Sequence, residues 1–381
     1  MENKAYKFRL TPTQSEIRAL RQFAGCARYV YNRALSEAKA RYENNGVKTN
    51  YYDWDKWVIQ WKYSEETSWL KDCPAQVLQQ SLKNLESAYI NFFNRRAGFP
   101  RFKKKGMKDS FRYPQFVKVD SDKQKVYLPK IGWVKCRGHR PIEGTIKHAT
   151  VSYKAGHWYV SIMVEYELTI KTHPFPSNCV GLDMGVVKTI ATSGRQTYTL
   201  PTSIREVESQ IKAVQRRIAR CVKGSNRRNK LKLQLQKLWC RLSNIREDFH
   251  HKTTTDICKN HAVVVVEDLY VTGMTKSAKG TVANPGTNVT QKRGLNRNIL
   301  KQGWGIIVGQ LGYKLKWLGG APLVTVNAAY TSQTCAVCGA RDKRSRVRQS
   351  VFRCTHCGYI DNADYNAAKV ILSKGVPSTQ Y

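Results

Sequence analysis

The alternation of hydrophobic and polar positions divides the first half of the chain into a strand, a helical stretch and a second group of strands. Residues 4–10 alternate as a half-buried strand does, and Thr11-Pro12-Thr13 then predicts the start of a helix. From there to about residue 97 the pattern is mostly helical, with breaks at Gly46 and at residues 71–74. The later alternating stretches are short and bounded by Gly and Pro; they cover residues 117–119, 125–128, 146–153 and 157–165.

Short strands of this kind predict a small antiparallel β-barrel. The strand at residues 4–10 would complete this barrel, which makes the helices of residues 13–97 an insertion into it. Within the insertion, Trp54, Trp57 and Trp61 fall on one helical face at spacings of three and four. Such a stripe forms either buried core or a base-stacking platform, and core is the commoner outcome.

The second half of the chain has the pattern of a mixed α/β fold. Apolar residues at helical spacing predict two helical arms in residues 203–252, and residues 223–226 separate them, which favours an antiparallel helical hairpin. The apolar run at residues 262–269 predicts a strand buried on both faces, as in parallel sheets. The remaining expectations are a linker at 171–178, a β-hairpin at 179–200, a loop at 273–297, a helix at 298–318, a strand at 323–326 and a polar tail from Ser373.

Composition adds a partner to this picture. The 381 residues are enough for two or more domains, and 65 Lys and Arg against 27 Asp and Glu give a formal net charge of +38. Such an excess predicts that a polyanion neutralises the protein in use. A membrane partner is disfavoured because no apolar run approaches the ~20 residues that span a bilayer. The scattered cysteines and the absence of a signal-peptide pattern at the N-terminus predict the cytoplasm.

Four of the 11 cysteines form the most specific motif. Cys335 and Cys338 form one CxxC pair and Cys354 and Cys357 a second, 15 residues further on, which is the spacing of a zinc ribbon. A glycine follows each pair, where the chain must turn. Four thiolates complete a tetrahedron around Zn²⁺ and leave no position for water, so this ion is expected to be structural. His356 is an alternative ligand to Cys357, but the repeated CxxCG pattern favours the cysteine.

Three acidic residues on separate segments predict catalysis. Asp183 lies in Val-Gly-Leu-Asp-Met-Gly, Glu267 ends the buried run, and Asp364 begins Asp-Tyr-Asn-Ala-Ala. Singly, each has an ordinary explanation as a turn residue or a strand-end cap. In an RNase H-like sheet the three places converge, and together they can hold two Mg²⁺ ions about 3.5–4 Å apart. Asp268 and Asp361 are the competing acids.

Basic residues are concentrated at two further places. Residues 203–252 carry 14 Lys and Arg against four Asp and Glu, and a second group lies between the CxxC pairs. These charges form either a solvated face or a contact with a phosphate backbone, and the ten surplus charges on the hairpin favour the backbone contact. The candidate contacts are Arg216, Arg217, Arg220, Arg227, Arg228, Arg341, Lys343, Arg344 and Arg346.

These motifs resemble the TnpB family of transposon-encoded RNA-guided nucleases, which are related to type V CRISPR effectors. The matching segments are residues 6–13, 26–32, 99–103, 130–132, 139–142, 181–185, 266–269, 331–335 and 364–368. In the family, the catalytic acids are the Asp of the first nuclease motif, the Glu of the second and the Asp before Asn-Ala-Ala. They fall on Asp183, Glu267 and Asp364, and this sequence does not depart from that triad.

The resemblance implies a multidomain α/β fold, in which an RNase H-like RuvC nuclease domain with a zinc-ribbon insertion follows an antiparallel β-barrel carrying a helical insertion. The implied domains are a wedge-like β-barrel (1–12 and 98–178), a helical recognition domain (13–97), the nuclease domain (179–330 and 359–381) and a nucleic-acid-binding zinc ribbon (331–358). It also implies a noncoding guide RNA from the transposon end, a double-stranded DNA target beside a short transposon-adjacent motif, and one protein per RNA in a prokaryotic cytoplasm.

Other functions are less consistent with the residues. A DDE transposase would present Asp, Asp and Glu in that order, whereas Glu267 lies in the middle here. A single-strand transposase needs two histidines separated by one hydrophobic residue, but His250 and His251 are adjacent. The remaining alternative is an RNA-guided DNA-binding regulator without cleavage, which would be expected to have replaced at least one of the three acids.

Overall fold

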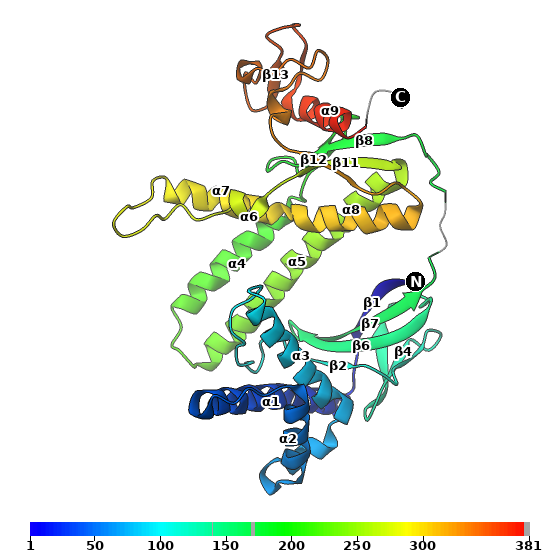
Figure 1. Ribbon diagram of the computed structural model, residues 1–381, viewed down its shortest axis with the longest axis vertical. Coiled ribbons are helices and arrows are strands. Elements are labelled where there is room, and N and C mark those ends of the chain that lie inside the picture. Colours follow the sequence, from blue (N-terminus) through cyan, green and yellow to red (C-terminus); the bar gives the residue numbers. More distant parts are fainter. Residues whose placement is uncertain (139, 169–171, 377–381) are drawn as a thin grey trace. The chain divides into compact units, whose positions relative to one another are not determined.

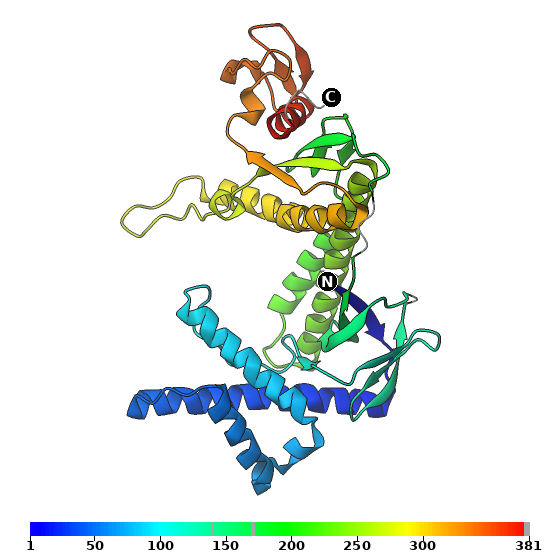
Figure 2. The same ribbon diagram turned by 45° about the vertical axis from the view of Figure 1, so that its right-hand side comes forward.

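The chain divides into two compact units, residues 1–168 and 169–381 (Figure 1). The computed structural model describes residues 1–138, 140–168 and 172–376. The first unit combines a helical group with a large sheet, and the second combines a smaller sheet, flanking helices and a small ribbon (Figure 2). No helix in these described ranges is long and apolar enough to cross a membrane.

The helices of the first unit follow the predicted pattern. They are α1 (Gln14–Asn45), α2 (Tyr51–Tyr63), the 3-10 helix η1 (Glu65–Asp72) and α3 (Ala75–Phe93). Helix α1 begins with a capping box between Thr13 and Glu16 and ends at Gly46, whose φ of 67° is the left-handed conformation that glycine adopts at little cost. Trp54, Trp57 and Trp61 are 2%, 7% and 5% exposed, so the core interpretation is confirmed.

An antiparallel sheet forms the rest of this unit. Its strands are β1 (Glu2–Leu10), β2 (Ser110–Tyr113), β3 (Lys118–Asp120), β4 (Lys125–Leu128), β5 (Gly132–Arg137), β6 (Thr145–Lys154) and β7 (His157–Tyr166). Their order is β2-β6-β7-β1-β5-β4-β3. Because β1 lies between β7 and β5, the first strand joins the later ones, and the helices lie between β1 and β2 as expected.

The second unit is built on a five-stranded sheet in the order β10-β9-β8-β11-β12. Its strands are β8 (Cys179–Asp183), β9 (Ile190–Thr192), β10 (Thr197–Tyr198), β11 (Val263–Asp268) and β12 (Val324–Asn327). Strand β11 is parallel to both of its neighbours, which confirms the parallel-sheet prediction for residues 262–269. The other pairs are antiparallel, so β8 is the strand at which the direction changes.

The helices of this unit are α4 (Ser203–Ala219), α5 (Asn226–Asn260), α6 (Val271–Met274), α7 (Val289–Gln302), α8 (Trp304–Leu318) and α9 (Ala363–Gly375). Helix α4 packs against α5, and the other helices cover the two faces of the sheet. Val264 and Val266 of β11 pack in one cluster with residues of α5 and α8, whereas Val265 packs with Ile371 of α9. Alternate residues of the strand therefore serve two different cores.

Four sequence-based expectations were wrong in part. Residues 298–318 are not one helix, because Gly303 (φ 72°) separates α7 from α8, and a Cβ there would lie 2.6 Å from Cε1 of His250. The loop expected at residues 273–297 also holds the first half of α7.

The linker expected at residues 171–178 packs against its own unit. His173 is 3% exposed and its Nε2 lies 2.9 Å from the carbonyl oxygen of Cys258. The polar tail expected from Ser373 begins later, because α9 continues to Gly375. Residues 377–381 of that tail, Lys171 of the linker and His139 of the 139–142 segment lie outside the described residues.

Candidate active site

The two parallel strands at the centre of the second sheet bring Asp183 and Glu267 side by side. Leu182 of β8 pairs with Val266 of β11, so the next residue of each strand is also a neighbour. Side chains alternate between faces along a strand. Leu182 and Val266 point into the core shared with α5 and α8, so Asp183 and Glu267 point to the opposite face. That opposite face is the one covered by α9.

Helix α9 reaches this face because two glycines leave room for it. A Cβ on Gly181 of β8 would lie 2.1 Å from the carbonyl oxygen of Ala368, and one on Gly375 would lie 2.4 Å from Cγ1 of Val265. Any larger residue would push the helix away from the sheet. The small residues Ala367 and Ala368, 3% and 0% exposed, complete this close contact. Gly181 and the Asn-Ala-Ala segment, known from sequence only as motifs, thus have a packing function.

Asp364 lies in the first turn of α9, where the N-cap Asn362 accepts a hydrogen bond from its backbone N–H at 3.0 Å. The helix start therefore faces the ends of β8 and β11. Lys188, in the connection between β8 and β9, forms an ion pair with Asp364, with Nζ 3.5 Å from Oδ2. Lys188 also lies over the ring of Tyr365, 4.8 Å from its centroid. Its position near the acids was missed by sequence reasoning, and nothing in its flanking residues indicates it.

The electrostatics of the site favour a cation. Burial, followed by the charges of Glu267 and Asp364, raises the pKa of Asp183 to about 7, and the positive charges of Arg346 and Lys188 only partly oppose this. Burial also raises the pKa of Glu267, whereas a hydrogen bond from Thr331 Oγ1 at 2.5 Å lowers it. Mutually repelling buried carboxylates are costly unless a cation compensates them. The donor set, hard carboxylate oxygens, fits Mg²⁺.

The carboxylates of the three acids face one side of the sheet but do not all lie within 4.8 Å of one another. Among the residues that the structure describes, the only group of three or more metal-ligating side chains with all ligand atoms within 4.8 Å is the cysteine cluster. The carboxylate oxygens of Asp183, Glu267 and Asp364 are therefore spread more widely than this. This wider spacing is compatible with metal binding, because carboxylates on opposite sides of a bound ion need not touch one another.

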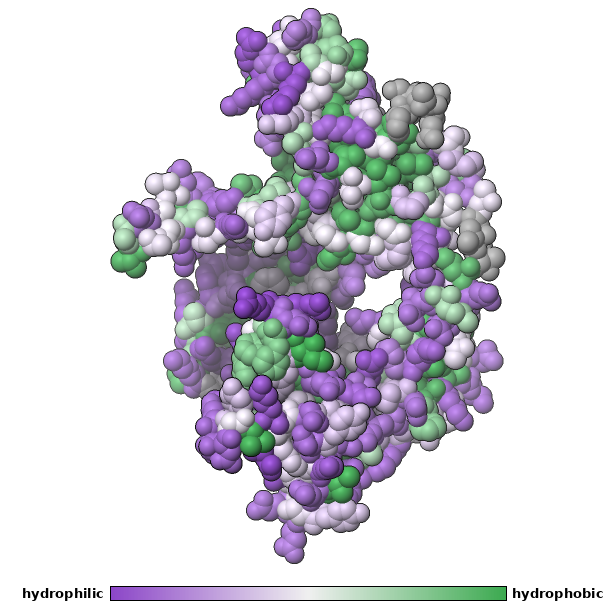
Figure 3. Space-filling model, viewed as in Figure 1, coloured by the Kyte–Doolittle hydropathy of each residue, from purple (hydrophilic) through white to green (hydrophobic). Residues whose placement is uncertain are grey.

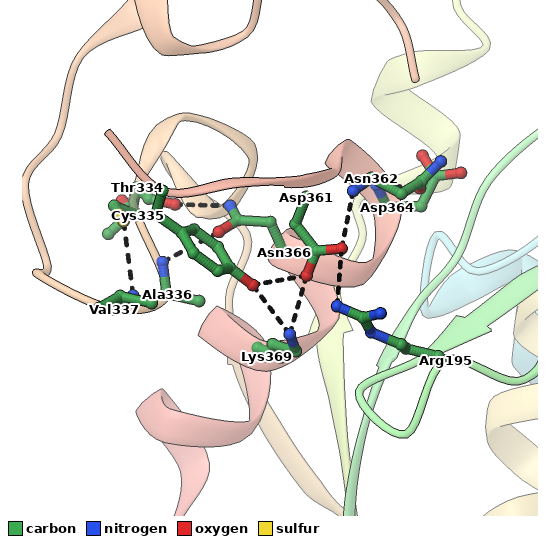
Figure 4. A network of polar contacts seen from close by, with 11 residues as sticks. Arg195, Thr334, Cys335, Ala336, Val337, Asp361, Asn362, Asp364, Asn366 and Lys369 are labelled. Atoms are coloured by element: carbon green, nitrogen blue, oxygen red, sulfur yellow. Dashed lines mark hydrogen bonds and ion pairs between the residues drawn. The ribbon is translucent and has the colours of Figure 1, made fainter. Parts of the chain in front are cut away.

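The competing acids have other environments. Asp268 ends β11 and is exposed. The side chain of Asp361 is 5% exposed and pairs with Lys369 at 2.8 Å and Arg195 at 3.3 Å (Figure 4). Burial alone would raise the pKa of Asp361, but hydrogen bonds from Lys369, Tyr359 and the Asn362 N–H lower it below its ordinary value. Asp361 therefore has a structural role in joining β14 (Ile360–Asn362) to α9.

The four cysteines form a tetrathiolate cluster. The sulfur atoms of Cys335 and Cys357 lie 3.7 Å apart, and those of Cys338 and Cys354 lie 3.5 Å apart. A tetrahedral ion with Zn–S bonds of about 2.3 Å requires sulfurs about 3.8 Å apart, so the cluster has the right size. Gly339 and Gly358 both have φ 72°, and their N–H groups donate to the carbonyls of Cys335 and Cys354. Glycine is thus required at both turns, as the sequence indicated.

Asn366 connects this cluster to the acidic site. Its side chain is fully buried, accepts a hydrogen bond from the Ala336 N–H at 2.9 Å and donates one to the Thr334 carbonyl at 2.8 Å (Figure 4). Thr334 and Ala336 flank the first ligand, Cys335, while Asn366 lies two residues after Asp364 on the same helix. One side chain therefore fixes the ribbon relative to the catalytic end of α9. The sequence showed this residue only as part of a motif.

The basic hairpin forms as predicted from α4 and α5. A small apolar cluster joins the two helices, and Arg216, Arg217, Arg220 and Arg227 are exposed. Arg228 differs from them, because its guanidinium donates to the carbonyls of Ile218 and Cys221 at 3.0 and 2.8 Å. It satisfies carbonyls at the end of α4 that have no partner within the helix.

Some of the basic residues of the ribbon interact with other side chains of the protein. Arg344 pairs with Asp342 at 2.8 Å, and the guanidinium of Arg341 lies over the ring of Tyr330. Lys343 and Arg346 are exposed, and the charge of Arg346 acts on Asp183. The two strands of this region, β13 (Val351–Arg353) and β14, form an antiparallel pair. The 3-10 helices η2 (Thr331–Gln333) and η3 (Lys343–Ser345) complete the ribbon.

Comparison with protein families gives three matches along the chain. Residues 149–278 match the family described as "Probable transposase", and residues 304–371 match "Cas12f1-like, TNB domain". Residues 1–47 match "Helix-turn-helix domain". Over that last range the structure has strand β1 and the single long helix α1.

Two curated relatives align with nearly the whole chain. The "Putative RNA-guided DNA endonuclease InsQ" of Escherichia coli (strain K12) is 47% identical over 372 residues, which cover 98% of this chain and 92% of the relative. A "Putative RNA-guided DNA endonuclease" of Streptomyces pristinaespiralis is 28% identical over 380 residues, covering 99% and 90%. Among solved structures, the "Cryo-EM structure of the Cas12f1-sgRNA-target DNA complex" matches with a TM-score of 0.54 and 15% identity, covering 99% of both chains. This mixed α/β multidomain fold therefore resembles that of a Cas12 effector.

Proposed function

Since the chain belongs to the TnpB family, we propose that it is a transposon-associated RNA-guided DNA endonuclease that cuts through a single RuvC-like, Mg²⁺-dependent site. The observation that carries this proposal is the arrangement of Asp183, Glu267 and Asp364 on the α9-facing side of one sheet. The strand order, three antiparallel strands followed by two parallel ones, supports an RNase H-like nuclease domain.

In the proposed mechanism, the carboxylates of Asp183, Glu267 and Asp364 would hold divalent ions, and those ions would position the scissile phosphate. Divalent ions held there would activate a water for in-line attack on phosphorus and stabilise the leaving 3′-oxygen. Thr331 fixes the orientation of Glu267, so one of its oxygens stays directed at the site. Lys188 restrains Asp364 and, with Arg346, supplies positive charge near the acids. These cations would also favour the approach of an anionic backbone.

The remaining parts take the roles expected for the family. The antiparallel sheet with its helical insertion would form the wedge-like β-barrel and recognition domain, which read the target and its adjacent motif. The cysteine cluster would hold one structural Zn²⁺. A guide RNA would pair with one strand of the target, and the displaced strand would reach the nuclease site first. One protein on one RNA suffices, because a single site can cut both strands in succession.

A regulator that binds without cutting is the alternative function. It would retain the fold, the basic surface and the zinc ribbon but would not need three acids on one side of the sheet. All three are present, and the buried acids carry a free-energy cost that a binding protein would not need.

The test is cleavage of matched duplex DNA by the protein loaded with the RNA that copurifies with it. Asp183→Ala, Glu267→Ala and Asp364→Ala should each abolish cutting of both strands. The loss should exceed the roughly 10–100-fold that removal of an outer-shell partner costs. Binding of RNA and target should persist, because the basic surface is unchanged.

Asp268→Ala is the matched control, since Asp268 is an exposed acid next to Glu267. Asp361 is unsuitable as a control, because loss of its buried ion pairs would disturb α9 itself. Cutting of one strand at the parental rate by Asp183→Ala protein would require a second nuclease centre and would refute the single-site proposal. Full activity in all three variants would place the nuclease site elsewhere, whereas absence of cutting by the parental protein loaded with its RNA would favour the regulator.

A further inference from the structure

A cavity in the first unit has no role in the proposed chemistry. Its volume is about 1090 Å³, and it lies entirely within residues 21–158. Its walls come from one side of α1, from η1, from the loop at residues 102–109 and from the turn between β6 and β7. Its size is at the upper end of the ~300–1,000 Å³ of ligand sites, so it has room for one nucleotide with its phosphate.

Cations and aromatic rings line this cavity together. Arg21, Arg33 and Lys105 contribute positive charge, and Trp69 and Phe102 are 38% and 53% exposed. Such exposure is unusual for large aromatic side chains in a soluble unit, which usually bury most of their surface. Phosphates and bases need these two kinds of partner, since cations neutralise the backbone and flat rings stack on bases.

The walls are held rigidly by contacts that leave the aromatic faces open. The Asn32 side chain both accepts from and donates to the backbone of Lys103, at 2.8 and 2.9 Å, which fastens the loop to α1. The indole N–H of Trp69 donates to the Glu66 carbonyl at 3.1 Å, and its ring meets that of Tyr29 edge to face at 5.1 Å. The ring is thus oriented before any ligand arrives.

A second fastening holds the far end of the loop. Asp109 forms an ion pair with Arg28 at 2.9 Å and accepts a hydrogen bond from the Gly106 N–H at 3.0 Å. Asp109 is the only carboxylate among the lining residues, and it is neutralised by this pair. Arg33 pairs with Glu37 at 3.0 Å, so Arg21 and Lys105 leave the cavity with a net positive charge, which favours an anionic ligand.

We propose that this cavity receives an unstacked nucleotide from a single-stranded stretch of nucleic acid, with the base against Trp69 and Phe102 and the phosphate near Arg21 and Lys105. The proposal rests on the proposed function, which supplies guide RNA and opened target DNA as sources. A continuous duplex presents no free base face along its length, so it would use the cations but not the rings.

Binding of labelled single strands to the full chain tests the rings. The probes are oligothymidylate and oligouridylate of about 12 nucleotides, within the site sizes known for such grooves, and a blunt duplex of equal length. Trp69→Leu/Phe102→Leu protein keeps apolar bulk but loses aromatic faces. It should bind the single strands at least about fivefold more weakly and the duplex as before. Its salt dependence should not change, because no charge is removed.

Two comparisons make the test specific. Trp133→Leu/Phe116→Leu removes equally exposed rings of the same unit outside the cavity and should leave binding unchanged. Arg21→Ala/Lys105→Ala should weaken single strands and flatten the salt dependence, whereas Arg18→Ala/Lys48→Ala serves as its charge-matched control. Equal loss in cavity and control variants, or equal loss for duplex and single strand, would overturn the proposal. Thermal unfolding curves identify any variant that fails to fold.

The source of the nucleotide is decided in the complex with RNA. 5-Iodouracil is placed either in the copurifying guide RNA or in the target DNA, and the crosslinked peptide is identified by mass spectrometry. Crosslinks to Trp69 or Phe102 from one of the two strands confirm the cavity and name its source. Crosslinking elsewhere, with none to the cavity from either strand, would refute it. Crosslinking reports contact and not cutting, so this result is independent of cleavage.

Discussion

At the scale of single residues, the charge of Asp183 makes stability depend on pH. Its pKa rises to about 7 in the fold from an ordinary 3.8, so the folded protein binds more protons than the unfolded chain between these values. The stabilisation from neutral Asp183 is complete below pH 3.8 and is lost as pH rises through 7. At roughly 1.4 kcal/mol per pKa unit, the upper limit is about 4 kcal/mol. Without divalent ions, Asp183→Asn should therefore be more stable than the parent at pH 8.

Urea unfolding in EDTA at pH 4 and pH 8 measures this difference. The gap between variant and parent should be small at pH 4 and open as the pH rises. Mg²⁺ at pH 8 should stabilise the parent more than the variant, because the carboxylate is then a ligand. An equal difference at both pH values would mean that Asp183 is not protonated in the metal-free fold.

Candidate site residues could be predicted where a metal-ligating side chain lies in a recognisable sequence motif. Asp183, Glu267 and Asp364 each follow or begin a recognisable element, and the four cysteines have a diagnostic spacing. Their supporting residues were not predictable. Lys188 and Thr331 acquire their roles only from strand register and chain reversal, which bring together positions far apart in sequence. The hydrogen bonds of Arg228 to the carbonyls of Ile218 and Cys221 were not predictable for the same reason, and its candidate phosphate contact stays a prediction.

At the scale of elements, α9 depends on the ribbon through Asn366. Asn366→Ala would leave the Ala336 N–H and the Thr334 carbonyl without their partner, at a cost of about 1–3 kcal/mol for each buried group. We expect the variant to keep one Zn²⁺ per chain, to unfold at lower urea concentration and to cut more slowly. Elemental analysis, unfolding and cleavage assays measure these three outcomes.

Ser373→Ala, which changes only a bond within α9, is the control for this variant and should behave as the parent. Loss of zinc from the Asn366→Ala protein would mean that Asn366 supports the ribbon itself. Unchanged cleavage would show that the ribbon and the acidic site are independent.

The helical hairpin carries exposed arginines and one arginine, Arg228, that donates to backbone carbonyls. Replacing Arg216, Arg217, Arg220 and Arg227 together with Ala should weaken nucleic-acid binding for every sequence alike. If all four contact phosphates of a duplex, the slope of log K against log salt should fall by about 3–4. Filter binding over a range of salt concentrations measures this slope. An unchanged slope would restore the solvated-face interpretation.

Arg228→Ala tests the capping role by itself. It should reduce the stability of the hairpin by about 1–3 kcal/mol, because carbonyls at the end of α4 lose a charged donor. The salt slope should hardly change. A drop of nearly one unit without destabilisation would instead assign Arg228 to phosphate binding.

Elements were predictable where one periodicity runs without interruption. The long helices, β1 and β11 have strong patterns, and the structure contains them within a few residues. The break at Gly303 was missed because helix continuity depends on a neighbour, His250, that no local pattern reveals. Strands β2 and β5 were missed because they are short: β2 is stabilised by pairing with the distant β6, and β5 pairs with the adjacent β4.

At the scale of the whole molecule, the charge of +38 should make stability depend on polyanions. Hydrophilic residues dominate the face seen in Figure 3. RNA at a free concentration of a hundred times its Kd would raise the free energy of unfolding by about 2.7 kcal/mol. This corresponds to a rise in Tm of roughly 5–10 °C for units of this size. Thermal unfolding with and without the copurifying RNA measures the shift. NaCl alone, which only screens the charge, should raise Tm less, and no shift with RNA would argue against neutralisation by nucleic acid.

Because Asp364 lies on the last helix, it is synthesised well after the other two acids. At about 5–20 residues per second, the ribosome needs roughly 10–40 s to add the approximately 180 residues between Asp183 and Asp364. Over that interval the basic hairpin follows the first unit out of the ribosome, while the proposed site still lacks the last of its three acids. The nascent protein can thus capture an RNA partner before it is able to cut, so an unguided nuclease need never exist free in the cell.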